Sequence, residues 1–493
     1  MKLFFKRNVI VFLLALVSFS FFTCDLKNYN TLSRVGLTVN LVQAARLDIG
    51  GFSNLTEDKA HFKGKYYSDK APGMSFLAVP VAYAFTRFVR VSPNVDLDDE
   101  GPNRKRTTLL LLTYFCTIAT SGLLTALAAA ALFGFIESKT ANWQAAAAGA
   151  ATYALATPTW GWATNFFGHA AAGALLIIGF VLVDKLAAGV RRTRDGKTIA
   201  GLILAAGLAL GTAITVEFPS AVPVAIILGY LTILNIRKQT FASALLITAA
   251  VGAVVAVTQI PLLLYNAAAF GAPFKLGYSN VVGFEAMKTG FFGIRLPRLD
   301  VLGEIIFGPR RGILWLSPVL VLGAAGAFDG LPRQSERARS VLIASIVVFY
   351  LLLNSSYAYW DGGWSTGPRH ITPAFPFLAL ALGMFYARVP VIFRTAILTL
   401  LGLSIIISLM CASVSMTSPE AMTNPLRELI LPSFLRGDLD QTALHAFFGA
   451  HGLWQLIPLL AAWLILGIAF LKTTATGKVM DAPPTPALQP ATP

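Results

Sequence analysis

Long apolar segments recur from one end of this 493-residue chain to the other. About 20 consecutive apolar residues are enough to cross a lipid bilayer as a helix. Only 13% of the residues are charged, whereas a soluble protein carries about a quarter. The pattern predicts an all-α polytopic membrane protein with about twelve transmembrane helices, within a range of about 11–13. The expected spans are residues 9–24, 108–134, 142–157, 170–187, 198–214, 220–235, 241–264, 311–327, 341–353, 372–387, 393–412 and 453–471.

Segment 73–91 is also long enough to cross, but it contains Pro80, Arg87 and Arg90. A charge at the bilayer centre costs about 2.5–3.5 kcal/mol. If this segment lies along the membrane interface, the short basic loops face the cytoplasm, as the positive-inside rule requires, and if it crosses they face outward. We therefore predict an interfacial segment and both termini in the cytoplasm. The basic residues that decide this orientation are Lys139, Lys185, Arg191, Arg192, Arg194, Lys197, Arg237, Lys238, Arg333, Arg337, Arg339, Arg388 and Arg394.

The two ends of the chain have different compositions. The N-terminus has a basic start and an apolar run, but Phe21–Thr23 before Cys24 are not small residues. A signal-peptidase site needs small residues, so we expect an uncleaved first span. Residues 473–493 are rich in Ala, Pro and Thr and are expected to form a disordered cytoplasmic tail after a membrane domain at 1–472.

The predicted topology places five polar segments outside the cytoplasm. They are residues 25–106, 158–169, 265–310, 354–371 and 413–451. These segments hold more than half of the 39 Lys and Arg residues. So much positive charge calls for an anionic partner, either the headgroups of the lipid bilayer or a phosphate-bearing lipid substrate.

The stretch Tyr66–Gly73 ends the polar part of the first of these loops. Its Lys70 is a point-charge partner for phosphate. Pro72 and Gly73 follow, and they allow the chain to turn sharply into a helix. Asp58, Asp48 and Asp69 lie nearby in sequence and are candidates for a general base, although a loop carboxylate is more often solvated surface.

A second polar cluster occupies residues 357–370. Trp and Tyr at the end of a span ordinarily form an interfacial belt. That interpretation covers the aromatic residues. It does not explain Asp361 beside Gly362, or Arg369 and His370 between Pro368 and the next span. Aromatic faces and a carboxylate suit a sugar ring, and arginine can bind phosphate bidentately. The candidate substrate-binding residues here are Trp360, Asp361, Trp364, Arg369 and His370.

Further candidates lie elsewhere on the same predicted side. Arg310 and Arg311 open a span as a basic pair. His169 ends a Trp-rich turn, where a structural hydrogen bond is the commoner role for a histidine. Glu217 lies at a span boundary, where an acidic residue is a functional candidate unless it caps a broken helix. The remaining candidates are Arg34, in an amphipathic stretch at 32–47, and Tyr67.

The sequence gives little sign of a cofactor. The five histidines form no HxxxH or HExxH pattern, the three cysteines are far apart, and no CxxC spacing exists. A divalent metal held by carboxylates remains an open alternative. There is no Gly-rich phosphate loop, so no nucleotide is expected, and no nucleic-acid partner is expected either.

The two clusters resemble motifs of the GT-C superfamily of membrane glycosyltransferases, in particular bacterial relatives of the protein mannosyltransferases and of the lipid A aminoarabinose transferase. Tyr67–Gly73 is similar to a Lys-Pro-Pro corner in those enzymes, with Ala71 in place of the first proline. Segment 360–370 resembles a late-loop motif. The family usually carries an acidic base early in its first loop, but here only Asp25 is acidic at that point, so the base stays open among Asp58, Asp48 and Asp69.

The resemblance implies a GT-C-like fold with juxtamembrane helices in the first periplasmic loop, in a bacterial inner membrane. It implies an inverting glycosyltransferase that moves a sugar from a polyprenyl-phosphate donor to a glycan, lipid or protein on the periplasmic face. Lys70, with help from Arg369 or the Arg310–Arg311 pair, would bind the donor phosphate. The alternatives are a flippase or transporter for lipid-linked sugars, and a polymerase or ligase of surface polysaccharide.

Overall fold

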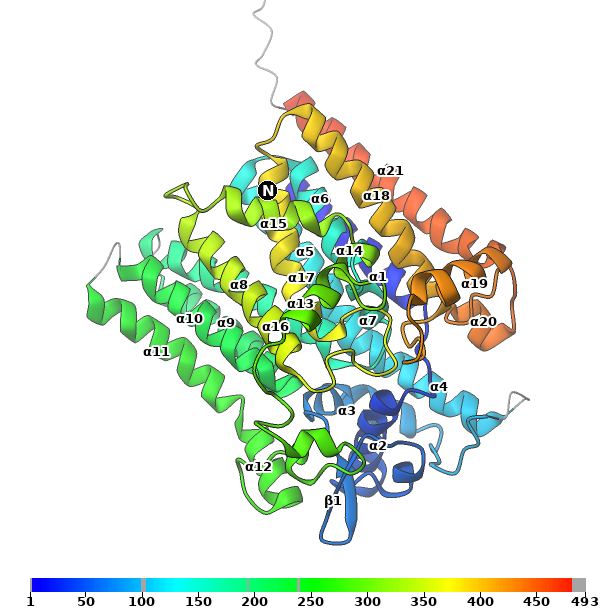
Figure 1. Ribbon diagram of the computed structural model, residues 1–493. Helices are drawn as coiled ribbons and strands as arrows, with labels where there is room; N and C mark the ends of the chain where they lie inside the picture. The colour runs from blue at the N-terminus through cyan, green and yellow to red at the C-terminus, as the bar shows by residue number, and fades with distance from the viewer. Residues whose placement is uncertain (1, 99–102, 193–194, 237–239, 481–493) are drawn as a thin grey trace, which may run out of the picture.

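The computed structural model describes residues 2–98, 103–192, 195–236 and 240–480, and it is a bundle of helices (Figure 1). The tail residues 481–493 lie outside the described residues, as do Arg194, Arg237 and Lys238 among the orienting basic residues. The helices of the bundle are α1 (Lys2–Ser20), α4 (Arg104–Thr117), α5 (Leu123–Thr140), α6 (Trp143–Leu155), α8 (Gly168–Arg192), α9 (Gly196–Val216), α10 (Ala221–Ile236), α11 (Phe241–Val257), α15 (Leu320–Asp329), α16 (Arg337–Ser356), α17 (Phe375–Tyr386), α18 (Val391–Val414) and α21 (Ile457–Met480).

The other helices and the two strands lie between and beyond the helices of the bundle. They are α2 (Tyr29–Ala44), β1 (Lys59–Phe62), β2 (Lys65–Ser68), α3 (Gly73–Thr86), α7 (Thr159–Ala163), α12 (Ile260–Phe270), α13 (Leu299–Phe307), α14 (Ile313–Leu316), α19 (Leu431–Arg436) and α20 (Ala443–Phe448). The protein is therefore an α-helical polytopic membrane protein, as the sequence predicts, with one small hairpin that the sequence did not lead us to expect.

Eight helical segments of the described chain are long and apolar enough to cross a membrane. The other four expected spans correspond to shorter or more charged elements, so their crossing stays a prediction. α1 carries its basic residues in its first turns, and α6 and α17 have only 13 and 12 residues. The expected span at 311–327 is interrupted, because α14 ends before Pro318, which has no N–H to continue the helix.

Both ends of the described chain lie at one end of the bundle, which we call the termini end (Figure 1). Arg7 near the start of α1 pairs with Glu137 at 2.6 Å and donates to the carbonyl oxygen of Thr473 at 3.3 Å. The C-terminal parts of α5 and α21 therefore meet the N-terminal part of α1. A chain that crosses the membrane an even number of times has both of its ends on the same side, as the predicted twelve crossings require. α21 itself continues to Met480, beyond the residue at which we expected the tail to begin.

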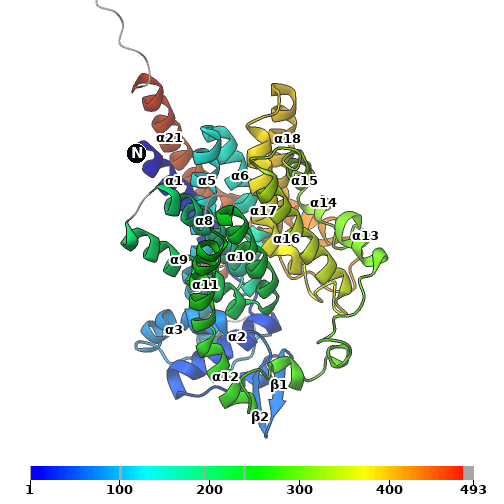
Figure 2. The same cartoon turned by 90° about the vertical axis from the view of Figure 1, so that its left-hand side faces the viewer.

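The opposite end, which we call the loop end, carries α2, α3, α12 and the β-hairpin (Figures 1 and 2). Asn28 caps α2 by accepting hydrogen bonds from the N–H groups of Asn30 and Thr31. α3 has 14 residues and is about 21 Å long. The hydrocarbon core is about 30 Å thick, so α3, like α6 and α17, does not reach across it as a regular helix on its own. Its packing beside α2 fits the interfacial placement predicted for segment 73–91.

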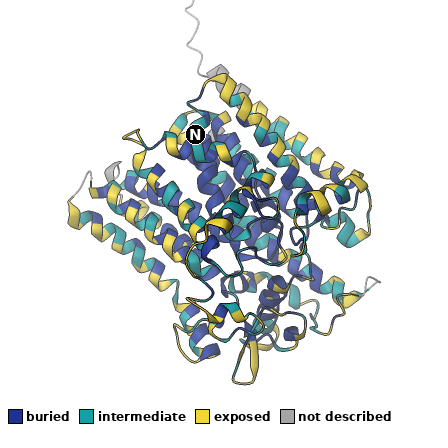
Figure 3. Ribbon diagram, in the orientation of Figure 1, coloured by how far each residue is buried: buried dark blue, intermediate teal, exposed yellow. Residues whose placement is uncertain are grey.

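Burial separates the centre of the bundle from its margins (Figure 3). The apolar window of α8 is 83% buried, whereas those of the α11–α12 segment and of α21 are only 17% buried. These outer helices are apolar all round, and side chains such as Leu246 and Leu464 are well exposed. A helix that is apolar on a face not covered by protein is typical of a lipid-facing position.

We expect the loop end to face outward, because the basic residues of the termini end follow the positive-inside rule. Asp98→Cys, at the loop end, should react with a membrane-impermeant thiol reagent added to intact cells. Gln334→Cys, in the exposed turn between α15 and α16, should react only after the membrane is permeabilised. The native cysteines are all buried and give a low background. The reverse labelling pattern would contradict this orientation.

Candidate active site

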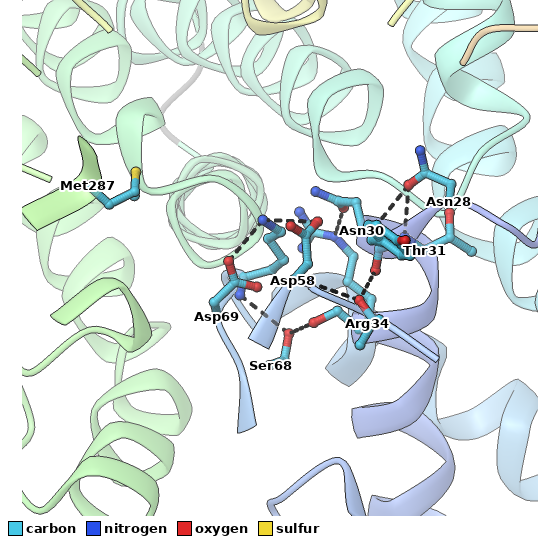
Figure 4. A network of polar contacts seen from close by, with 12 residues as sticks. Asn28, Asn30, Thr31, Arg34, Asp58, Ser68, Asp69 and Met287 are labelled. Carbon is cyan, nitrogen blue, oxygen red and sulfur yellow. Dashed lines mark hydrogen bonds and ion pairs between the residues drawn. The ribbon is translucent and has the colours of Figure 1, made fainter. Parts of the chain in front are cut away.

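Lys70 lies at the loop end between two carboxylates. Its Nζ is 2.9 Å from Oδ2 of Asp69 and 3.1 Å from Oδ2 of Asp58. The three side chains are only 15%, 3% and 11% exposed. Figure 4 shows Asp58 and Asp69 facing each other across these ion pairs. The sequence therefore identified three residues that the fold does bring together.

The β-hairpin explains why two aspartates eleven positions apart meet. Lys59 of β1 pairs with Ser68 of β2, so the residues just outside the pair, Asp58 and Asp69, lie next to one another. The two-residue turn has positive φ at both positions, 48° at Lys63 and 74° at Gly64. A type I′ turn has this geometry, which suits the twist of a hairpin.

The corner after Lys70 is tightly packed. Arg34 donates to the carbonyl oxygen of Ala71 at 2.9 Å, and α3 begins at Gly73. A Cβ atom on Gly73 would lie 2.5 Å from the backbone of Thr215, at the end of α9. Gly73 is therefore required by a close backbone approach rather than by an unusual backbone angle, which differs from the sharp bend that we expected from the sequence.

Arg34 and Glu217 form a buried ion pair that joins α2 to the bundle. Their side chains are 3.2 Å apart and are 3% and 13% exposed. Arg34 also donates to Oδ1 of Asn30, and Nδ1 of His169 lies 3.5 Å from the same Glu217 oxygen. Three predicted site residues thus come from a loop helix, the end of α9 and the start of α8.

Two residues of the late loop complete this cluster. Arg369 lies over the ring of Phe167 at 5.3 Å, and no ion pair is found for it within the described part of the chain. The ring of His370 lies between those of His169 and Tyr357, with 5.3 Å between centroids on each side. Both residues belong to the short 3-10 helix Arg369–Ala374 that precedes α17.

The charge of Asp58 affects the pKa values of both Lys70 and Arg369. Burial works against the charged form of Lys70, but Asp58 and Asp69 outweigh it and raise the pKa of the ammonium. Burial lowers the pKa of Arg369, and Asp58 is the largest charge that opposes this change. One carboxylate therefore acts on both cations. Burial also raises the pKa of the Asp69 carboxyl to about 6, against the opposing effect of Lys70.

The basic pair at the start of the interrupted span, Arg310 and Arg311, contacts the late loop. Arg311 is 1% exposed, and its guanidinium donates to the carbonyl oxygens of Asp361 and Gly363, each at 2.8 Å. Arg310 pairs with the Asp361 carboxylate at 2.7 Å and lies 5.6 Å from the centroid of the Trp360 ring. These contacts hold the late loop, residues 354–371, against the segment between α13 and α14. No contact of Arg311 or of the Asp361 carboxylate with Lys70 is found among the described residues.

The three remaining candidates lie apart from Lys70. Asp48 pairs with Arg46 through two contacts. Tyr67 is buried against Phe270, with 5.3 Å between ring centroids. The side chain of Trp364 is 57% exposed. We find no contact between these residues and the Lys70 cluster among the described side chains.

Sequence reasoning missed two residues next to Lys70. Tyr278, in the loop after α12, is close enough for its charge state to affect the pKa of Lys70. Burial raises the pKa of the Tyr357 hydroxyl to about 12, while Lys70 and Arg369 lower it, so this tyrosine also adjoins both cations. Tyr357 belongs to the second polar cluster, residues 357–370. Nothing in the sequence around Tyr278 indicated that this residue would affect Lys70.

A metal centre finds no structural support in the described residues. No group of three or more His, Cys, Asp or Glu side chains comes together there in a way that could hold a metal ion. Asp58 and Asp69 are the two carboxylates at Lys70, and the lysine ammonium already occupies the space between them.

The buried Arg34–Glu217 pair yields a prediction about stability. Arg34→Met should lower the free energy of unfolding by about 3–5 kcal/mol, because it leaves an unpaired charge in the protein interior. Arg34→Met combined with Glu217→Gln should recover most of this loss. Thermal unfolding in detergent measures the effect. Lys27→Met, which removes an exposed partner of Asp98, is the matched control and should change little. Equal losses in the single and double variants would contradict the pairing.

No protein-family model matches the chain, and no curated protein matches its sequence. Solved structures do match its fold. ArnT from Cupriavidus metallidurans, bound to undecaprenyl phosphate, superimposes with a TM-score of 0.51 at 14% identity, over 95% of this chain and 72% of ArnT. The archaeal oligosaccharyltransferase AglB from Archaeoglobus fulgidus, with an inhibitory peptide and a dolichol-phosphate, gives 0.54 at 12% identity. That match covers 84% of this chain and 56% of AglB, just over half its length. The chain thus has the fold of the GT-C membrane glycosyltransferases.

Proposed function

We propose that this protein is an inverting glycosyltransferase of the bacterial inner membrane, with its active site on the periplasmic face. It would transfer a sugar from a polyprenyl-phosphate donor to a cell-envelope glycan, lipid or protein. The observation that carries the proposal is the nearly buried contact of Lys70 with Asp58 and Asp69. The charge of Asp58 also opposes the lowering of the Arg369 pKa by burial. Two cations from loops almost 300 positions apart suit a phosphate group at the membrane surface.

The donor phosphate would replace carboxylates around Lys70. In the absence of donor, Asp58 and Asp69 hold the ammonium in position. Arg369 has no carboxylate of its own in the described residues, so its guanidinium is available for a second phosphate oxygen. A fixed pair of cations in a site that excludes water stabilises the charge of a departing phosphate more strongly than the same pair in water.

Asp69 is the carboxylate best suited to act as the general base. Its Oδ2 contacts Lys70, but its Oδ1 is buried and has no partner among the described groups. Its pKa near 6 makes it a stronger base than an ordinary aspartate and leaves it mostly ionised at neutral pH. Phosphate bound to Lys70 would offset the positive charge that lowers this pKa, so donor binding would make Asp69 more basic.

The reaction then follows from these positions. The acceptor hydroxyl would lose its proton to Asp69 while its oxygen forms a bond to the anomeric carbon. The bond from that carbon to the phosphate oxygen would break, and its electron pair would remain on the polyprenyl phosphate, next to Lys70 and Arg369. Attack from the face opposite the phosphate inverts the anomeric configuration.

The structural neighbours support the choice of donor. ArnT is described with undecaprenyl phosphate and AglB with a dolichol-phosphate, so this fold accommodates lipid phosphates in at least those two proteins. A polymerase or ligase of surface polysaccharide would use the same phosphate chemistry. A flippase would move the lipid-linked sugar across the bilayer without cleaving it, so an assay of sugar transfer separates it from the proposed enzyme.

We expect Lys70→Met and Arg369→Met each to lower the rate of sugar transfer by about 10²–10³-fold, because each removes a cation that stabilises the leaving phosphate. Transfer from radiolabelled polyprenyl-phosphate sugars by purified protein measures this change. Lys65→Met, which removes an exposed lysine from the same hairpin, is the control and should retain full activity. Full activity in the Lys70 or Arg369 variant would remove that residue from the site.

The pKa of Asp69 predicts the pH dependence of transfer. A general base acts only when it is deprotonated, and kcat/KM for the donor reports the free enzyme, so kcat/KM should rise with pH through about 6 and level off above it. The inflection in kcat should lie at higher pH, because bound phosphate makes Asp69 more basic. Asp69→Asn should abolish this acidic limb together with most of the activity. Asp58→Asn should weaken donor binding but keep the limb. A pH profile without an inflection near 6 would exclude Asp69 as the base.

A further inference from the structure

The chain between α12 and α14 exposes large apolar side chains at residues 291–307. Four of them are between 66% and 85% exposed, namely Phe291, Leu296, Leu299 and Phe307. The sequence analysis places this stretch in a polar outer segment, residues 265–310. Apolar side chains that gather at a surface in this way mark a contact with another protein or with a membrane. We call residues 291–307 the apolar segment.

The helix of this segment, α13, is apolar on two opposite faces. Val301 and Ile305 lie one turn apart and are buried where α13 packs against α16. Leu299 and Phe307 lie on the other face and are exposed. A helix at the surface of a soluble protein turns a polar face to water. The outer face of α13 is therefore suited to apolar surroundings.

Polar groups of the segment are bonded to other protein groups. The Asp300 carboxylate pairs with Arg298, and Oε1 of Glu304 accepts a hydrogen bond from the backbone N–H of Arg310 at 3.3 Å. The indole N–H of Trp315 donates to the carbonyl oxygen of Phe307, at the end of α13, at 2.9 Å. Lipid chains cannot satisfy such groups, so a lipid-facing segment needs protein partners of this kind.

The segment lies beside α16, one of the helices long and apolar enough to cross a membrane (Figure 2). The backbone N–H of Arg298 donates to the carbonyl oxygen of Ser355 at 3.1 Å, and that of Arg295 donates to the carbonyl oxygen of Ser356 at 2.8 Å. Ser356 is the last residue of α16, so the two arginines lie where this span ends. Arg295 is exposed and forms no ion pair within the described residues, so its charge is available to a lipid phosphate.

The same part of the chain is bonded to both loops that form the candidate site. The backbone N–H of Ala358, in the late loop, donates to the carbonyl oxygen of Gly293 at 2.8 Å. The backbone N–H of Val282, nine residues after the start of the segment that follows α12, donates to the carbonyl oxygen of Lys59 in β1 at 3.0 Å. Lys59 directly follows Asp58. A contact that fixes the apolar segment would therefore also fix the hairpin and the late loop.

We propose that the apolar segment is inserted into the lipid leaflet at the loop end of the bundle. Phe291, Leu296, Leu299 and Phe307 lie among the lipid chains, and Arg295 lies at the level of the lipid phosphates. The segment is thus a membrane anchor that holds the hairpin and the late loop at a fixed position relative to the bilayer. This inference concerns only the contact with lipid, so it does not depend on which reaction the site performs.

The test attaches the environment-sensitive fluorophore NBD to single introduced cysteines in the full chain. Leu296→Cys and Phe307→Cys place the label in the apolar segment, and Lys65→Cys places it on the hairpin as a matched control. All three side chains are exposed, so labelling leaves the packing intact, and the native cysteines are buried. The labelled proteins are reconstituted in nanodiscs of phosphatidylethanolamine and phosphatidylglycerol. Half of the samples carry doxyl groups on the acyl chains, which quench NBD on contact.

We expect NBD at positions 296 and 307 to emit at shorter wavelength than NBD at position 65, and to lose most of its intensity in the doxyl-lipid discs. Iodide in the water should quench the label at position 65 and leave the other two nearly unchanged. Emission and iodide quenching equal to those of the control would overturn the inference. A shift to shorter wavelength without doxyl quenching would also overturn it, because protein, such as a second copy of this chain, would then cover the segment.

Discussion

The loop end of this protein depends on a lysine ammonium held between two carboxylates in a nearly dry environment. Opposite unit charges 4 Å apart attract by about 4 kcal/mol at an effective dielectric constant of 20. A buried charge whose partner is removed destabilises the folded protein, because its lost hydration is no longer offset. Lys70 lies directly before the corner at which α3 begins. Asp58 and Asp69 lie side by side at the open end of the hairpin, one before β1 and one after β2. The same ion pairs therefore fix the hairpin, the corner and the start of α3 at once.

Charges collect at the two ends of the bundle because the membrane interior excludes them. At the termini end, Lys139 pairs with Asp184, and Arg388 pairs with Asp329 and Glu336. These pairs join α5 to α8, and the end of α17 to the turn between α15 and α16. Around Lys70, the charged side chains instead come from loops and helix ends that are distant in sequence, and Arg369 has no ion pair among the described residues.

The late loop shows how one motif can be divided between structure and chemistry. Arg311 donates to the backbone of Asp361 and holds the loop in shape, while Arg369 lies over Phe167 and His370 lies against His169 and Tyr357. The sequence presents all of these residues as equivalent polar candidates. Only contacts with Phe167, His169 and Tyr357 distinguish the residues that face the site from those that support it.

The sequence alone determined the membrane class and eight of the apolar helical segments, because these follow from hydropathy. The interfacial segment and the role of Lys70 are predictions from charge placement and local turn chemistry. The sequence also resembled the GT-C superfamily, whose fold the structure has. It did not predict the hairpin, the break before Pro318 or the electrostatic influence of Tyr278 on Lys70. It also could not separate Asp48 from Asp58, since both are loop aspartates in similar surroundings. Tertiary structure decided these points, because strand register and the approach of distant loops set which buried charges meet, and neither is encoded in local spacing.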